Sequence, residues 1–590
     1  MNVAVPVSPA AVRGFDPILL GILQNLLVAI MDECELNLSR TAFSPFIYEG
    51  KDYCVGLLDA QGRTVVQSRG SVPSFMADLG VPIQDALDLY GPEGLHEGDV
   101  LIMNFADICG QHLNNVVIYT PVHWQEKLVG FVVTRAHWTD IGASGLSTTS
   151  TEIFQEGIQF RTLKVYKRGE IDPEIMRVIR HNVRFPELTL GDMGAQVSAV
   201  ELGRRRFVAL IEKYGWESIE TSIHAMWDHS EKLARDRLRA MPDGVYAAEA
   251  LLDDDGISNE AIPLKLKVII AGDRMTVDFS EFPPQTKGPM NSGAAVGPNV
   301  AKLAFKAAIV PEGPPNDGVF RPVDVILPPG TILSAVDNAA MSLWTVSIKT
   351  IVDVILRALS QAVPDRIPAA HHGSMGVYTF NGVNRETGKP YRLGDIVLGG
   401  WGAQPDSDGF SPLKTVTHGD TRQIPLEIEE NLYPVLIERH EFRPDSAGPG
   451  AFRGGLGLKK VYAIPEGGNL MVAFERSKCP PWGLFGGGEA QVGYVVVKKP
   501  GDETGVRYQK VSRVPLAPET RVELFSSGGG GRGHAYERAP ERVVEDVRMG
   551  YVTVEGAAKD YGVIVDASSL EIDQDATAQR RATMRDTSKA

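Results

Sequence analysis

The chain has 590 residues, of which 43% are hydrophobic and 23% are charged, and its formal net charge is -15. A single compact core normally holds fewer residues than this, so we expect about three or four domains or sub-domains. The acidic balance argues against a polyanionic partner, so nucleic acid is not expected as a ligand.

The cysteine pattern favours a reducing compartment. The chain has four cysteines, Cys34, Cys54, Cys109 and Cys479, and none of them forms a CxxC pair. The segment Met1–Gly14 has neither the basic nor the apolar region of a secretory signal. The longest apolar stretch, Ile18–Met31, is too short to span a bilayer. We therefore expect a soluble cytoplasmic protein without a membrane segment.

The first third of the chain predicts one buried helix followed by a set of strands. Asp16 and Pro17 are typical of a helix N-cap with proline at the first helical position, and the helix continues over Ile18–Leu38. Short apolar and β-branched runs separated by turn residues then predict strands at 53–58, 64–67, 100–104, 116–120 and 128–134. The last of these is apolar or β-branched almost throughout, which favours a central buried strand.

The rest of the chain alternates between helical and β patterns. Residues 173–241 predict helices, with Tyr214 and Gly215 as a break. Residues 261–279 return to strand-like alternation, and 342–362 predict a long helix. Residues 378–533 are rich in glycine and short strands, which favours a barrel or sandwich. A short helix is predicted at 553–561, closed by Gly562.

These patterns predict an α+β, multidomain fold. We expect a mixed α/β N-terminal half with a helical insertion, followed by a β-rich, glycine-rich C-terminal part. The predicted divisions are 1–172, which contains the candidate site, 173–244 (helical), 245–377 (α/β), 378–565 (β-rich) and 566–590. The last segment has no aromatic residue and many polar ones, so it is predicted to be a disordered tail.

Two histidines stand near predicted strand ends. His112 precedes one strand and His137 follows the next, so a hairpin brings them to one place. Imidazole is a common metal ligand, and a nearby oxygen from Asn115 or Asp140 would complete a site. Such spacing is weak evidence by itself, because buried histidines with satisfied hydrogen bonds are more common than ligands.

Other carboxylates flank this region. Glu49 lies just before a buried-looking strand, and Glu152 and Glu156 follow the second histidine. Each is either a further site residue or a charge in a solvated turn or loop.

No nucleotide site is recognisable in the sequence. None of the glycine-rich segments matches GxxxxGK[ST], and none is a GxGxxG between a clear strand and a helix. The chain also lacks a GxSxG nucleophile motif. The run Gly528–Gly531 is either an anion-binding nest or, more commonly, a set of tight turns.

A series of motifs in order along residues 15–565 resembles the hydantoinase B/oxoprolinase family, which includes the large subunits of acetone and acetophenone carboxylases. The motifs are Ile47-Tyr-Glu-Gly-Lys-Asp-Tyr53, Gly110-Gln-His-Leu-Asn-Asn115, Arg135-Ala-His-Trp-Thr-Asp-Ile-Gly142, Gly191-Asp-Met-Gly-Ala-Gln196, Val277-Asp-Phe-Ser280, Gly399-Gly-Trp-Gly-Ala403, Arg443-Pro-Asp-Ser-Ala-Gly448, Arg453-Gly-Gly-Leu-Gly457, Pro480-Pro-Trp-Gly-Leu-Phe-Gly-Gly487 and Ser527–Gly531. So many motifs in family order make a chance similarity improbable.

The resemblance implies a division of labour between two chains. A partner of the hydantoinase A type, with an actin-like ATPase fold, holds ATP and Mg, and the B-type chain carries out the second half-reaction in a hetero-oligomer. The resemblance also implies a divalent metal, zinc, manganese or iron, on the B-type chain. By motif, its ligands are Glu49, His112, Asn115 and His137.

The chain departs from the family pattern at two positions. Asn115 stands where the family has an aspartate, and the usual NDP sequence reads Asn104-Phe-Ala106. Each change removes a negative charge, which weakens the attraction for a hard divalent ion. Asp107 and Asp140 are the carboxylates available to compensate.

Three functions follow from the resemblance. The leading one is ATP-dependent opening of a cyclic amide by water, with His137 and Asp140 as catalytic residues; Asp140 would orient an imidazole or accept a proton. The alternatives are ATP-dependent carboxylation of a ketone and a non-catalytic scaffold role. The loss of the aspartate at Asn115 favours the scaffold, whereas the presence of His112, His137 and Asp140 disfavours it.

Overall fold

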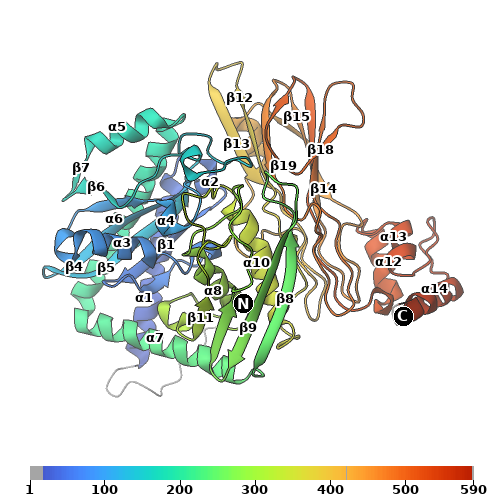
Figure 1. The fold of residues 1–590 in the computed structure, drawn as a ribbon, viewed down its shortest axis with the longest axis horizontal. Helices are drawn as coiled ribbons and strands as arrows, with labels where there is room; N and C mark the ends of the chain where they lie inside the picture. The colour runs from blue at the N-terminus through green and yellow to red at the C-terminus, as the bar shows by residue number, and fades with distance from the viewer. Residues whose placement is uncertain (1–16, 420, 588–590) are drawn as a thin grey trace.

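The computed structural model describes residues 17–419 and 421–587. In Figure 1 the N-terminal part, coloured blue to teal, lies on one side, and the β-rich part, coloured yellow to orange, lies on the other. A smaller sheet, coloured green, lies below and between them. The predicted α+β, multidomain class is confirmed. The predicted N-cap Asp16 lies outside the described residues, and the predicted domain boundaries stay predictions.

The N-terminal part is built on a seven-stranded sheet of order β2-β1-β5-β4-β3-β6-β7, in which every neighbouring pair is antiparallel. Its strands are β1 Tyr53–Asp59, β2 Thr64–Gln67, β3 Val100–Met103, β4 Asn115–Trp124, β5 Lys127–His137, β6 Leu163–Lys167 and β7 Glu170–Ile171. The five predicted strands correspond to β1 to β5. β5 lies between β1 and β4, and most of its residues are buried, as its apolar composition predicts.

Two long helices, α1 (Pro17–Thr41) and α6 (Pro186–Tyr214), pack against each other and against this sheet. Gly203 of α6 allows the close approach, because a Cβ there would lie 2.8 Å from Val132 Cγ1 and 3.0 Å from Cys34 Sγ. The predicted break at Gly215 is confirmed: this residue has φ 82° and separates α6 from α7 (Trp216–Arg239).

α1 is longer than the apolar stretch that predicted it. Its 25 residues are long and apolar enough to cross a membrane by length and composition alone. Leu23, Leu27, Met31, Cys34 and Leu38 recur at helical spacing and are fully buried. They belong to the same hydrophobic cluster as residues of the first sheet, so the core accounts for the apolar face of α1.

A second, four-stranded sheet has the order β11-β10-β9-β8, with β10 and β11 parallel. Its strands are β8 Gly244–Leu252, β9 Ile262–Ala271, β10 Arg274–Asp278 and β11 Val323–Ile326. α8 (Val296–Ala308) and α10 (Trp344–Leu359) pack together, and α10 also contacts β8 and β9. α10 matches the long helix predicted at 342–362 and is buried almost all round.

The β-rich part is a sandwich of two sheets, of order β13-β12-β16-β19 and β14-β15-β20-β17-β18. The first contains β12 Val377–Val383, β13 Pro390–Ile396, β16 Gly468–Ala473 and β19 Lys510–Leu516. The second contains β14 Leu436–Phe442, β15 Leu458–Ile464, β17 Tyr494–Lys498, β18 Val506–Tyr508 and β20 Thr520–Phe525. Their inner faces share one hydrophobic cluster, in which Phe380 and Leu470 meet Tyr462 and Leu524.

The glycine-rich segments form neither an isolated nest nor simple turns. They cross one another backbone to backbone: Gly529 donates to Gly455 O at 2.9 Å, and Gly400 donates to Ser527 O at 3.1 Å. A Cβ on Gly529 would lie 2.0 Å from Trp401 O, and one on Gly400 would lie 2.0 Å from Gly455 O. Glycine is therefore needed here for close approach of chains.

The C-terminal end corrects one prediction. α12 (Pro540–Arg548) is followed by α13 (Val554–Asp560), which is capped by Thr553 close to the predicted helix at 553–561. The tail predicted to be disordered from 566 instead contains α14 (Gln574–Thr587). The composition of the segment did not predict this helix, because polar contacts rather than apolar ones hold it against the rest of the chain. Arg581 donates to Tyr561 O at 3.1 Å and to Arg538 O at 2.7 Å.

The remaining helices are short connections. They are α2 Pro45–Tyr48, α3 Gly80–Tyr90, α4 Ala106–Cys109, α5 Pro173–Asn182, α9 Asp317–Phe320 and α11 Leu426–Leu432. α2 and α4 matter for function, because the segments that follow them carry candidate site residues.

Candidate functional site

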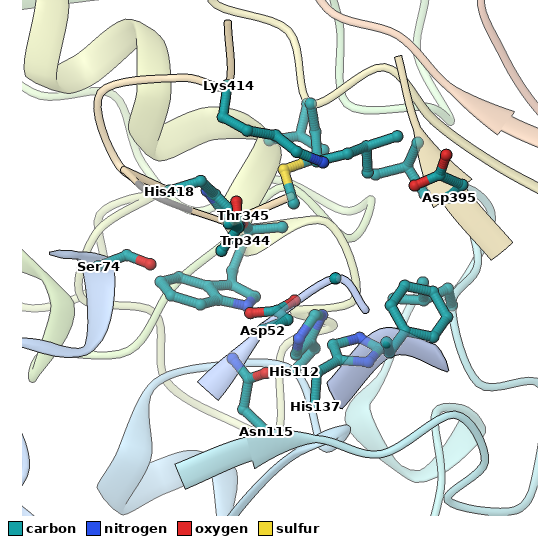
Figure 2. Close-up of a pocket in the computed structure, with 18 of the residues that line it drawn as sticks. Asp52, Ser74, His112, Asn115, His137, Trp344, Thr345, Asp395, Lys414 and His418 are labelled. Atoms are coloured by element: carbon teal, nitrogen blue, oxygen red, sulfur yellow. The ribbon is translucent and has the colours of Figure 1, made fainter. Parts of the chain in front are cut away.

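A small cavity, here called the central cavity, lies where the first sheet meets the start of α10 and the segment 414–424. Its volume is about 50 Å³, which is enough for a few water molecules or one ion. The polar residues that line it include Asp52, His112, Asn115, His137 and Lys414, and Figure 2 shows their side chains converging on one space. Phe46, Phe75, Trp344 and Val346 form part of its apolar wall.

The β4–β5 hairpin brings the two predicted histidines together. Asn115, the first residue of β4, pairs directly with His137, the last residue of β5. His112 lies three residues before Asn115, and its ring centroid is 5.0 Å from that of His137, with the planes at 73°. His112 Nδ1 lies 3.2 Å from Ser342 O, just before α10, which holds the ring in place.

A glycine fixes the loop that carries His112. Gly110 ends α4 in the left-handed conformation at φ 70°, and a Cβ there would lie 2.9 Å from Gly293 O. Asn104 holds the next part of the loop by donating to Leu113 O at 2.8 Å. Strand register and loop geometry thus both place His112 beside His137.

A buried chain of hydrogen bonds sets the orientation of Asn115. Arg135 and Gln111 both donate to the Asp78 carboxylate, at 2.7 Å each. Gln111 therefore turns its oxygen toward Asn115 and accepts from Asn115 Nδ2 at 2.9 Å. Asn115 Oδ1 remains buried, without a partner among the described residues. The network thus presents a neutral oxygen beside His112.

Asp52, and not Glu49, lines the central cavity together with the two histidines. Glu49 is the C-cap of α2 and is not among the residues that line the central cavity. Asp52, three residues later, lines the cavity, and its backbone oxygen accepts from His137 N at 3.1 Å. Burial raises the pKa of the Asp52 carboxyl, while nearby His112 and Lys414 oppose that shift.

Asp140 has a structural environment. Its carboxylate accepts from the backbone N–H groups of Gly142, Arg184 and Phe185, ahead of the first turn of α6. It also pairs with the Arg184 guanidinium at 3.4 Å, and it does not line the central cavity. None of these contacts is with an imidazole, which was the predicted partner of Asp140. The carboxylate instead binds the backbone of the segment that precedes α6.

Unpartnered polar atoms gather in the central cavity. Six buried side-chain atoms of its lining residues have no hydrogen-bond partner in the described part of the chain: Asp52 Oδ1, Ser74 Oγ, Asn115 Oδ1, His137 Nδ1, Trp344 Nε1 and Thr421 Oγ1. Buried polar atoms in proteins are nearly always hydrogen-bonded. This concentration points to a bound ion, water or substrate as the missing partner.

Further titratable residues, which sequence reasoning missed, surround the same cavity. Lys414, His418 and Asp395 line it from the C-terminal half, and all three side chains are buried. Burial lowers the pKa of Lys414 to about 8, so this ammonium can give up a proton near neutral pH. No motif signalled these residues, because their approach depends on packing between segments far apart in the chain.

His112 and His137 are neutral over a wide pH range. Burial lowers the pKa of His112 to about 3, with a contribution from the neighbouring His137, and lowers that of His137 to about 4. A neutral imidazole presents a nitrogen lone pair, which is the form that binds a metal or accepts a proton.

These shifts predict acid sensitivity of the metal-free chain. Imidazole in an unfolded chain titrates near pH ~6.5. Below that pH, His112 and His137 therefore bind protons in the unfolded state but remain neutral in the folded state. The free energy of unfolding should therefore be at its full value above about pH 6.5. It should fall as the pH decreases toward 4, by about 1.4 kcal/mol per pH unit for each imidazole. Urea unfolding with a chelator, compared between the wild type and His137→Gln, measures it. An equal slope in both would contradict the prediction.

The donor atoms fit a divalent metal only in part. Within residues 17–419 and 421–587, no three or more His, Cys, Asp and Glu side chains are grouped as metal ligands. The chemistry nevertheless suits one, because a carboxylate, an amide oxygen and two neutral imidazoles meet at this cavity. The unpartnered Asp52 Oδ1, Asn115 Oδ1 and His137 Nδ1 are the atoms that would draw together around it.

A larger cavity, here called the side cavity, adjoins the first. Its volume is about 320 Å³, within the range of small-molecule sites. It shares Phe46, His137 and Leu146 with the central cavity, so His137 stands between the two. Its other walls come from the loop after β5, the start of α6 and the outer face of the β12–β13–β16 sheet.

A model of the hydantoinase B/oxoprolinase family matches residues 16–535. The chain is 29% identical over 594 residues to a Pseudomonas sp. (strain NS671) protein provisionally named as the B component of a D-/L-hydantoinase, covering 96% of this chain and 98% of that one. It is also 29% identical over 582 residues to the beta chain of the Pseudomonas jessenii caprolactamase, covering 96% and 99%.

Two solved structures share the fold. The crystal structure of ATP-dependent caprolactamase from Pseudomonas jessenii superposes with a TM-score of 0.91 at 27% identity, over 96% of this chain and 100% of that chain. A nucleotide-free acetone carboxylase structure also gives a TM-score of 0.91, at 19% identity, over 98% and 84%. The second likeness is one of fold alone.

Proposed function

The chain belongs to the hydantoinase B/oxoprolinase family, and on that premise we propose that it is the ring-opening component of an ATP-dependent cyclic amide hydrolase. The reaction adds water to the amide carbonyl carbon and breaks the ring C–N bond. The ring nitrogen takes up a proton, and the product carries a new carboxylate. Before this step a partner subunit transfers the terminal phosphoryl group of ATP to the carbonyl oxygen, which leaves ADP, and the phosphate is released when water opens the ring.

One observation carries this proposal: the central cavity gathers buried polar atoms that have no partner among the described residues, around two neutral imidazoles. The nucleophile is water that gives up a proton, and the unpartnered atoms of Asp52 and His137 on the cavity wall can either accept that proton or hold a metal that lowers the pKa of the water. A leaving nitrogen needs a proton donor, and Lys414, with a pKa of about 8, lies across the same cavity. Trp344 Nε1 supplies an unpartnered donor for the carbonyl oxygen.

We further propose that Asp52, His112, His137 and Asn115 hold a divalent metal, with Asp52 taking the place predicted for Glu49. When bound, such an ion polarises a carbonyl and lowers the pKa of water. Asn115 contributes a neutral oxygen, so we expect weaker binding than a carboxylate would give. The Asp78–Gln111 chain keeps that oxygen turned toward His112.

The partner subunit is the second element of the proposal. The names of two relatives describe each as one component of a multi-chain enzyme, which supports assembly with a second chain. We propose that a hydantoinase A-type protein, which holds ATP and Mg, forms a hetero-oligomer with this chain. The solved relative is described as ATP-dependent, which supports placing ATP in the assembled enzyme.

The test is an assay of this chain co-purified with its A-type partner. We expect ATP hydrolysis stimulated by a lactam or hydantoin, with ring-opened product formed in equal amount and no requirement for bicarbonate. A requirement for bicarbonate with a ketone substrate would identify a carboxylase instead. The absence of substrate-stimulated ATP hydrolysis across lactams, hydantoins and ketones would identify a scaffold.

A further inference from the structure

The side cavity carries a concentration of positive charge that the ring-opening chemistry does not explain. Its wall contains Arg184, Arg392 and Arg513, and no aspartate or glutamate of the described chain lines it. This is unusual for a protein with a net charge of -15. A small cavity with arginine and no lining carboxylate attracts anions.

The strand register builds this wall as an ordered polar row. Asn381 of β12 pairs directly with Arg392 of β13 on one side and with Asn469 of β16 on the other. Residues directly opposite one another on neighbouring strands point to the same face, so these three side chains stand side by side on the face away from the sandwich core. Arg392 Nε donates to Asn381 Oδ1 at 2.8 Å, which fixes the guanidinium against the row.

Arg392 also links the two halves of the cavity. Its Nη1 donates to Thr139 O at 3.3 Å, across to the loop that follows β5. The side chain is 16% exposed, so its charge is largely shielded from solvent and acts at close range. The bond to Thr139 holds Arg392 close to the end of β5, because Thr139 follows His137 by two residues. Arg392 and His137 both line the side cavity.

The carboxylate of Asp140, which lies beside this wall, does not cancel the charge. It lies 3.4 Å from Arg184 and 4.0 Å from Arg392, so it is shared between two guanidinium groups. It also accepts three backbone N–H groups, so its acceptor capacity is largely used. Arg513 adds a third positive charge to the same wall. A net positive charge remains for a ligand.

We infer that the side cavity is an anion-recognition pocket that holds a carboxylate or phosphoryl group of the substrate, while His137 faces the reacting carbonyl. This inference rests on the proposed function, and it narrows the substrate class to cyclic amides that bear an anionic group when they reach this chain. The planar guanidinium of Arg392 suits an oxyanion, which it can bind with two parallel N–H donors. The polar row of Asn381 and Asn469 supplies further donors.

The test measures binding to the full chain by calorimetry, without turnover. The probes are 5-oxoproline, which carries a carboxylate, 2-pyrrolidinone, which is the same ring without it, and inorganic phosphate. We expect 5-oxoproline to bind at least about tenfold more tightly than 2-pyrrolidinone, which corresponds to about 1.4 kcal/mol. Arg392→Gln should remove that advantage, and Arg513→Gln should reduce it.

Arg385→Gln is the matched control. Arg385 lies on the turn of the same β12–β13 hairpin, is exposed, contacts Glu466 and lines neither cavity. Binding of the anion should therefore be unchanged in this variant. Thermal unfolding of each variant checks that the fold is retained, and Arg513, which is exposed, keeps the test open if Arg392→Gln is unstable.

The three probes distinguish a substrate carboxylate from a phosphoryl group as the bound anion. They also test the anion pocket separately from the proposed ring-opening function. Preference for the carboxylated ring, lost in Arg392→Gln, assigns the pocket to a substrate carboxylate. Phosphate binding with the same dependence, without a preference for the carboxylated ring, assigns it to the activated, phosphorylated substrate. If neither anion binds in an Arg392-dependent way, the inference is wrong, and ring opening by the assembled enzyme still tests the proposed function separately.

Discussion

Replacing His137 by alanine is expected to lower kcat for ATP-dependent ring opening by about 10²- to 10⁴-fold, the range typical of a lost proton-transfer group. His137 lines both the central cavity and the side cavity. The substitution therefore removes a group next to the reacting carbonyl whichever of the two cavities holds the substrate. His137 is also one of four proposed metal ligands, and removing it should lower the bound metal in parallel.

The same substitution should leave folding and assembly intact. The strand pairing uses only the backbone of His137, and its ring Nδ1 has no partner among the described residues. The structural losses are the ring contacts with His112 and Phe46, at centroid distances of 5.0 and 5.1 Å. His181→Ala, an exposed imidazole on α5, is the control and should keep full activity. A His137→Ala enzyme with near wild-type kcat would contradict the proposed site.

Replacing Asp52 by asparagine is expected to cost about 10²- to 10³-fold in activity, whereas replacing Glu49 by glutamine should change it less than about twofold. Both substitutions remove one carboxylate, keep the side-chain size and lie three residues apart. Only Asp52 lines the central cavity, and its unpartnered Oδ1 is the acceptor that the proposed chemistry uses. Asparagine keeps the shape and lowers the cost of burying a charge, so Asp52→Asn should remain folded.

Local patterns predicted much of the fold. The alternation of residues 261–279, the helix at 342–362 and the strand at 64–67 are present as β9 and β10, α10 and β2. These elements follow from side-chain periodicity, which a single sequence displays. The prediction of a disordered tail from 566 was wrong, because α14 is held by hydrogen bonds to the backbone oxygens of Tyr561 and Arg538. The composition of a segment does not reveal contacts of this kind.

The candidate site was predictable where it depends on one hairpin. The strand–turn–strand spacing placed His112 and His137 together, because antiparallel pairing fixes which residues face each other. The choice between Glu49 and Asp52 depends instead on how the chain turns after α2, where Lys51 has φ 56°. Neighbouring carboxylates in one motif cannot be told apart without that geometry.

Long-range packing supplied the remaining site residues. Lys414 and His418 come to the cavity from the C-terminal half, and Arg392 reaches the side cavity from β13. Asp140, chosen for its nearness to His137 in sequence, turns toward the start of α6 instead. Nearness along the chain is a poor guide wherever a strand has just ended and the backbone changes direction.

We propose that the ring is opened at the cavity lined by Asp52, His112 and His137. This proposal is tested most directly by initial rates of ATP-dependent product formation for wild-type, Asp52→Asn and Glu49→Gln enzymes, each co-purified with its partner, with bound metal measured on the same samples. We expect Asp52→Asn to lose both activity and metal and Glu49→Gln to keep both. Loss of both in Glu49→Gln, with Asp52→Asn fully active, would contradict the proposal.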